Sequence, residues 1–268
     1  MPKRPKAYHR PQDLTEALQL LTQPETAPLA GGTHLLARRE APAAVVDLQA
    51  LGLDEIKQQG GRLHLGATAR LAKIAEAVAA DADSETPARL LQQAIHLAGP
   101  NTYRNAATPG GIVAARLPDS EFLAALLVLN AEVALRTPEI TSMRLANYLG
   151  RAERPRGLIT AITIPWAAGR GASERVARTP ADYPIVSVTL WQPEDDSPRL
   201  AATGISQRPM RLDAAEQALA AGITDEAVEA AAAAARAACQ HPGDFRGDAA
   251  YRAEVAAVLT RRVLQELY

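Results

Sequence analysis

The chain has 268 residues, which suits one large domain or two of moderate size, and its apolar fraction of 47% is ordinary for a globular protein. A net charge of −1 gives no reason to expect nucleic acid or an anionic membrane as a partner, and no stretch reaches the ~18 consecutive apolar residues of a membrane span. The short basic start lacks the apolar region of a signal peptide, so we expect a cytoplasmic protein. With one cysteine, Cys239, and scattered histidines, the sequence predicts no internal disulfide and no metal site.

The first half of the chain alternates between predicted helices and strands. Asp13, with Glu16 three residues later, indicates the start of a helix over 11–21. Thr33 is a candidate cap for a short helix over 36–39, and Thr68 for a helix over 68–80. The remaining predicted elements of this half are a helix over 86–97 and strands over 43–48, 63–66, 132–136 and 158–165.

A different pattern follows residue 165. Residues 166–171 are typical of a linker or hairpin tip, and strands over 174–178, 185–191 and 200–205 predict an antiparallel sheet. Helices are expected over 212–220, from Thr224 or Asp225 through Cys239, and over 248–267. The inward face of the last helix is predicted to carry Tyr251, Val255, Val258, Leu259 and Val263. We therefore predict two domains, 1–165 and 166–268, of the α+β class.

Two glycine pairs, each followed by an apolar segment, are the strongest functional signal. Residues 29–33 read LAGGT, and residues 107–111 read ATPGG. Paired glycines permit positive φ and let backbone N–H groups approach an anion closely. One such pair alone is more often an ordinary turn, but two of them predict loops that converge on one diphosphate.

These stretches resemble the FAD-binding medium subunit of the molybdenum hydroxylases, a family that includes the flavin subunit of aerobic carbon monoxide dehydrogenase and the flavin domain of xanthine dehydrogenase. The family's loops run roughly A-G-G-T-(D/N)-L and R-N-x-A-T-I-G-G-N, and they stand here at 30–35 and 104–112. Residues 117–126, 174–188 and 244–252 resemble further family segments in the same order. The resemblance implies a two-part, PCMH-like FAD-binding domain followed by a smaller domain of three-stranded antiparallel sheet plus helices.

The resemblance also implies FAD as the cofactor and assigns no catalytic acid, base or nucleophile to this chain. The glycine loops would hold the diphosphate, Glu121 would bind a ribose hydroxyl, and Arg175 would lie near the flavin ring, where a cation stabilises the anionic reduced flavin. From the residues alone, Glu121 is also readable as a solvated residue near a helix start, and Arg175 as a surface charge. The implied cofactor-binding set is Leu29, Ala30, Gly31, Gly32, Thr33, His34, Leu35, Ala107, Thr108, Gly110, Gly111, Glu121, Ile159 and Arg175.

Three positions depart from the family pattern: His34 replaces a small acid or amide, Pro109 an aliphatic residue, and Ile112 an asparagine. Pro109 removes an N–H donor and Ile112 a side-chain amide. Two functions therefore stay open. One is an electron-transfer flavoprotein subunit working with a large molybdopterin-binding subunit and a small iron–sulfur subunit. The other is a structural or binding subunit of the same fold with lost or weakened FAD binding. A stand-alone FAD-linked reductase or oxidase is a third reading.

Overall fold

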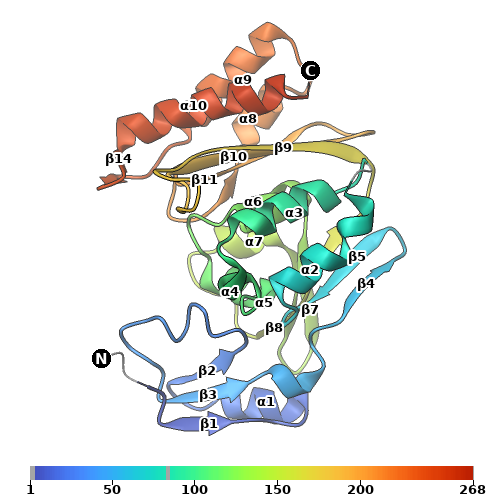
Figure 1. Cartoon of the computed structure of the whole chain (residues 1–268), viewed down its shortest axis with the longest axis vertical. Coiled ribbons are helices and arrows are strands. Elements are labelled where there is room, and N and C mark those ends of the chain that lie inside the picture. Colours follow the sequence, from blue (N-terminus) through green and yellow to red (C-terminus); the bar gives the residue numbers. More distant parts are fainter. Residues whose placement is uncertain (1–3, 83–84, 268) are drawn as a thin grey trace.

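The computed structural model describes residues 4–82 and 85–267, which form three parts stacked along the long axis (Figure 1). A small parallel sheet of order β1-β3-β2 forms the N-terminal end of the stack, and helix α1 packs on it. Helix α1 begins as predicted, because the Asp13 side chain accepts the Glu16 N–H at 2.8 Å. The elements of this part are β1 (Ala7–His9), α1 (Leu14–Leu21), β2 (Thr26–Leu29), β3 (Ala44–Asp47) and the 3-10 turn η1 (Gln49–Leu51).

The middle part is an antiparallel sheet of order β4-β5-β8-β6-β7 with a group of helices against it (Figure 1). Helix α6 is apolar on all sides after Glu121, and every one of its residues is buried, which makes it the centre of the molecule. The elements are β4 (Ile56–Gln59), β5 (Arg62–Gly66), α2 (Leu71–Ala77), η2 (Ala79–Asp81), α3 (Ala88–Leu97), α4 (Asn101–Arg104), α5 (Pro109–Ala115), α6 (Glu121–Val128), β6 (Glu132–Arg136), β7 (Ile140–Arg144), α7 (Leu145–Gly150) and β8 (Leu158–Pro165).

The C-terminal part is an antiparallel sheet of order β12-β11-β10-β9, packed on α6 by its inner face and covered by three helices on its outer face (Figure 1). The three predicted strands are present, and the two-residue strand β12 adds a fourth to the sheet. The elements are β9 (Gly169–Val176), β10 (Val186–Pro193), β11 (Arg199–Thr203), β12 (Met210–Arg211), α8 (Asp213–Ala218), α9 (Asp225–Ala237), β13 (Gly243–Asp244), β14 (Gly247–Asp248) and α10 (Ala249–Gln265).

Several local predictions were wrong. Residues 33–37 form turns, with no helix after Thr33. Helix α2 starts only at Leu71, because Arg70 before it is extended, and the N–H of Thr68 donates to the carbonyl of Leu53. Residues 169–171 belong to β9 and are not a linker. The division of the chain at residue 165 stays a prediction.

The last helix buries a different set of residues from the one predicted. Leu259 and Val263 are buried, but Tyr251 and Val258 are 43% and 41% exposed. Arg252 is fully buried instead, because its guanidinium donates to the carbonyl oxygens of Ile185 and Gly204 at 2.6 and 2.8 Å. No helix among the described residues is long and apolar enough to cross a membrane.

Candidate functional site

The two glycine segments meet in the structure, as the sequence predicts. Residues 31–35 belong to no helix or strand, so their backbone N–H groups are not committed to a ladder. A Cβ atom on Gly31 would lie 1.8 Å from the carbonyl oxygen of Ala106, which leaves room only for glycine. Gly32 has φ +69°, a conformation that favours glycine. The first segment therefore lies directly against the chain that leads into the second.

The second glycine segment is a helix start and not the predicted turn. Thr108 is the N-cap of α5, and its hydroxyl accepts the Gly111 N–H at 3.2 Å. Pro109 occupies the first helical position, where its missing N–H would have had no intrahelical partner anyway. A Cβ atom on Gly110 would lie 2.7 Å from that of Ala67, so this glycine permits close packing of α5 on the chain after β5.

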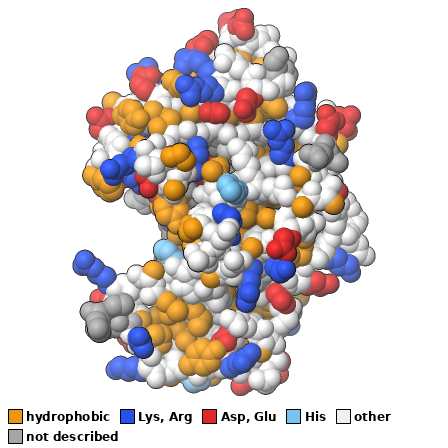
Figure 2. Space-filling model, viewed as in Figure 1, with side chains coloured by type: hydrophobic (Ala, Val, Ile, Leu, Met, Phe, Trp, Pro, Cys, Tyr) orange, Lys and Arg blue, Asp and Glu red, His pale blue; other side chains and the backbone are white. Residues whose placement is uncertain are grey.

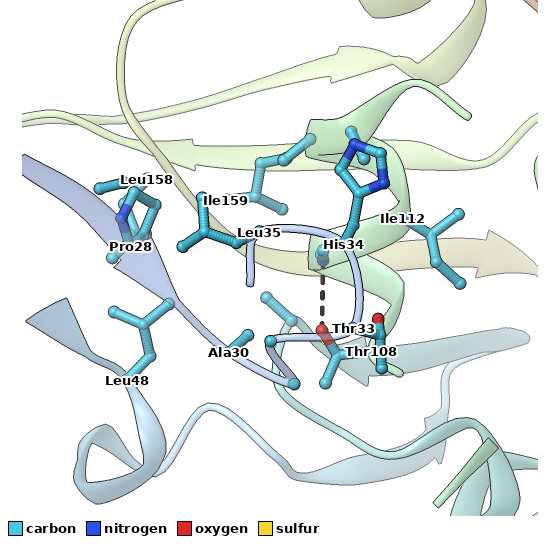
Figure 3. A pocket seen from close by; sticks show the side chains of 18 of the residues that line it. Pro28, Ala30, Thr33, His34, Leu35, Leu48, Thr108, Ile112, Leu158 and Ile159 are labelled. Carbon is cyan, nitrogen blue, oxygen red and sulfur yellow. Dashed lines mark hydrogen bonds between the residues drawn. The ribbon is translucent and has the colours of Figure 1, made fainter. Parts of the chain in front are cut away.

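A cavity of about 310 Å³ opens between these segments and β8, within the size range of small-molecule sites. It lies where the N-terminal and middle parts meet, and Figure 2 shows the molecular surface hollowed between these parts. Pro28, Leu48 and Leu158 form an apolar wall on one side, whereas His34 and Ile112 lie on the other (Figure 3). The predicted residues that line the cavity are Ala30, Gly31, Gly32, Thr33, His34, Leu35, Thr108, Gly110, Gly111 and Ile159.

Two predicted residues, Leu29 and Ala107, do not line the cavity. Leu29 ends β2 and packs its side chain near Gly32, and Ala107 is buried. Both residues pack on the side of the glycine segments that faces away from the cavity, so they present no side chain to a ligand.

Two cations that the sequence prediction missed, Arg38 and Arg154, also line the cavity. Burial, together with these two charges, lowers the pKa of His34. Arg154 belongs to residues 151–157, RAERPRG, where three arginines stand between a helix and a strand. That density of positive charge in a short connecting segment was the available signal.

Glu121 lies in a second cavity of about 210 Å³, which shares Thr33, His34 and Tyr103 with the first. Its residue is 3% exposed, so the reading as a solvated acid is wrong. Oε2 accepts a hydrogen bond from Arg175 at 3.0 Å, whereas Oε1 is buried without a partner. Burial raises the pKa of Glu121 to about 7, against the opposing effect of Arg175.

Arg175 is not a free surface charge, because its side chain is only 15% exposed and is paired with Glu121. It lines neither of the two cavities. When Glu121 is ionised, the pair carries no net charge, and its second carboxylate oxygen stays unpaired. The placement of Arg175 near a flavin ring stays a prediction.

Known proteins match this chain along most of its length. Residues 4–167 match the family described as "FAD binding domain in molybdopterin dehydrogenase", and residues 175–267 match the "CO dehydrogenase flavoprotein C-terminal domain". The carbon monoxide dehydrogenase medium chain of Afipia carboxidovorans is 30% identical, covering 96% of this chain and 95% of its own. The uncharacterised Escherichia coli protein YgfM is also 30% identical, covering 94% and 92%.

The fold agrees with these sequence relations. A solved structure of carbon monoxide dehydrogenase from Hydrogenophaga pseudoflava, in a form lacking the Mo-pyranopterin moiety, superimposes with a TM-score of 0.89 at 26% identity. It covers 99% of this chain and 97% of its own. The chain thus belongs to the FAD-binding medium subunits of the molybdenum hydroxylases, a family of oxidoreductase subunits, and its cofactor is FAD.

Proposed function

We propose that this chain passes electrons from iron–sulfur clusters on a partner subunit, through FAD, to an external acceptor. The observation that carries the proposal is the joined pair of cavities, which combines an apolar wall, two guanidinium groups and a buried carboxylate.

The residues of the site fit a flavin dinucleotide. Residues 31–35 line the cavity outside any helix or strand, so their backbone N–H groups are available to a diphosphate, and Arg38 and Arg154 supply opposite charge. The apolar wall excludes water from the ligand, and Oε1 of Glu121, a residue of the smaller cavity, has no hydrogen-bond partner within the chain. When bound, FAD supplies reversible acceptance of one or two electrons. The residues of this chain bind and orient it and set the charge around it.

We further propose that the partners are a large molybdopterin-binding subunit and a small iron–sulfur subunit. The relatives named medium chains support this, because that name belongs to assemblies of several chains. The cytoplasmic location and the individual ribose and flavin contacts of Glu121 and Arg175 stay predictions of the same proposal.

The test combines flavin content with electron transfer in the assembled complex. Purified protein is expected to show the two visible flavin bands and to release FAD on denaturation. In the complex with both partners, substrate should bleach these bands, and an external acceptor should restore them. A colourless protein that takes up no added FAD would favour the structural subunit. Turnover of electron donors by the isolated flavin-loaded chain would favour the stand-alone reductase or oxidase.

A further inference from the structure

The second glycine segment has few backbone donors left for a diphosphate. Pro109 has no N–H. The N–H of Gly110 donates to the carbonyl of Ala67 at 3.0 Å, and the N–H of Gly111 donates to the Thr108 hydroxyl at 3.2 Å. Close packing of Gly110 on Ala67 prevents a simple rearrangement that would free its N–H. The start of α5 therefore forms a small-residue wall of the cavity, and the negative charge of a diphosphate needs another partner.

Arg38 and Arg154 are placed to be that partner. Both line the larger cavity, and neither has an ion pair to any residue within 4–82 and 85–267. Both also act on His34, whose pKa is lowered by burial and by these two positive charges. The wall of the cavity thus carries positive charge that no acid of the described chain balances.

The segment that carries Arg154 is held by a buried arginine. Arg116 ends α5 in the left-handed conformation with φ 53°, and its residue is 6% exposed. Its guanidinium lies 4.9 Å from the centre of the Tyr148 ring and donates to the Tyr148 carbonyl at 2.9 Å. It also donates to the carbonyls of Arg151 and Glu153 at 2.8 and 3.1 Å. Residues 151–157 are thereby fixed without helix or strand structure.

A second arginine holds the same segment from the C-terminal part. Arg208 donates to the carbonyls of Leu149 and Arg151 at 2.6 and 2.5 Å, and to that of Ala152 at 3.2 Å. These bonds fix the chain just before Arg154. Ordering a cation before its ligand arrives removes part of the entropic cost of binding.

Arg116, Arg154 and Arg208 form a cluster of positive charges, and none of them has an ion pair with an acid among the described residues. Burial, together with the nearby charges of Arg208 and Arg154, lowers the pKa of the Arg116 guanidinium. An anion beside Arg154 would relieve this repulsion, whereas a neutral ligand would not.

We propose that Arg154, with Arg38 from the turn after the first glycine segment, binds the diphosphate of FAD through its guanidinium, and that Arg116 and Arg208 are positioning residues for Arg154. This inference rests on FAD being the ligand of the larger cavity. A guanidinium is planar and presents paired N–H donors that match two phosphate oxygens. In this chain, side-chain cations take over a diphosphate contact that α5 is unable to supply through its backbone.

The test compares Arg154→Gln with Arg156→Gln, a change in the same exposed segment at a residue that does not line the cavity. Affinity for FAD and for riboflavin is measured by quenching of flavin fluorescence on apoprotein, at low and high salt. Arg154→Gln should weaken FAD about tenfold or more, should leave riboflavin unchanged, and should reduce the salt dependence of FAD binding. Arg156→Gln should leave the affinity for FAD, the affinity for riboflavin and the salt dependence of FAD binding unchanged.

Equal effects of the two substitutions, or an equal loss of riboflavin affinity in Arg154→Gln, would overturn the inference. A wild-type protein that binds neither ligand would instead overturn FAD as the occupant, so the two failures are distinguishable.

The positioning role is tested by Arg208→Gln alone and combined with Arg154→Gln. If Arg208 acts through Arg154, the single change should weaken FAD several-fold and reduce the salt dependence, and the double variant should bind FAD as weakly as Arg154→Gln alone. Additive losses would show that Arg208 acts on the fold independently, which would overturn the positioning role. Thermal unfolding of each variant gives the stability change that a purely structural role would produce.

Discussion

Replacing Glu121 by Gln should remove a specific pH dependence of stability. The carboxyl is buried, and its pKa rises from 4.5 to about 7 on folding. Between these two values the unfolded chain ionises and the folded one stays protonated, so unfolding releases a proton. The free energy of unfolding of the wild type therefore falls by about 1.4 kcal/mol per pH unit from this group, and by about 3 kcal/mol in all. The contribution is fully present below pH 4.5 and is lost as pH rises through about 7.

Glutamine keeps the size of the protonated carboxyl but does not titrate. Near pH 4.5 the two proteins should differ only by the altered contact with Arg175, because both carry a neutral side chain. By pH 8 the variant should have gained about 3 kcal/mol relative to the wild type, since only the wild type then holds a buried carboxylate. Other titrating groups are common to both proteins and cancel in the difference.

The assay is urea unfolding of flavin-free protein at intervals from pH 4.5 to 8. Glu132→Gln, which removes the more exposed ion pair with Arg62, controls for the loss of an acid–arginine pair. Parallel pH profiles for wild type and Glu121→Gln would refute the reasoning, because they would mean that Glu121 ionises in the folded protein as it does in the unfolded chain.

Three further predictions follow from the same structure. Gly31→Ala places a Cβ atom 1.8 Å from a carbonyl oxygen, so it should cost ~1–3 kcal/mol in urea unfolding and reduce flavin content, whereas Gly150→Ala, with open space around it, should do neither. Arg252→Met removes a fully buried, paired cation and should cost about 3 kcal/mol by the same measurement. Affinity for FAD, measured by fluorescence titration, should rise several-fold between pH 6.5 and 8, because a ligand hydroxyl that donates to Glu121 favours its ionised form. Burial and the charges of Arg38 and Arg154 hold the pKa of His34 below its ordinary value, which moves its titration away from this range and not into it.

Local signals in the sequence predicted the elements whose structure depends on neighbouring residues. The cap at Asp13 and the β-branched strand at 158–165 are both present. Thr33 and Thr68 failed as caps: residues 33–37 form turns beside the cavity, and the N-cap of α2 is Arg70, two residues after Thr68. A cap residue signals a helix only where tertiary contacts leave its backbone free to form one.

The site was predictable where glycine was required and unpredictable where charge was involved. The glycine segments are visible in sequence because no other residue fits the close approach at Gly31. The density of arginines over 151–157 is visible in the sequence, but the fold decides which arginines line the cavity without an acidic partner, as Arg38 and Arg154 do. Pro109 was expected to cost a hydrogen bond, yet it stands at the first position of α5, where proline is favoured and no intrahelical donor is lost.

The Glu121–Arg175 pair connects the ligand site with the C-terminal sheet. Glu121 begins α6, and Arg175 lies on β9, where its second amino group donates to the carbonyl of Asp182. The next residue, Tyr183, lines the smaller cavity together with Glu121. A ligand that forms a hydrogen bond with Oε1 of Glu121 would change the charge that Arg175 faces. It would thereby change how strongly Arg175 of β9 binds the carbonyl of Asp182, beside the smaller cavity. Loss of the proton from Glu121 therefore changes its pairing with Arg175, and in the proposed site it would also change the hydrogen bond to the ligand. The urea unfolding series is repeated with FAD bound to separate the effect on ligand binding from the effect on packing. Only a hydrogen bond from the ligand to Glu121 would shift the midpoint of the pH profile of unfolding free energy to lower pH.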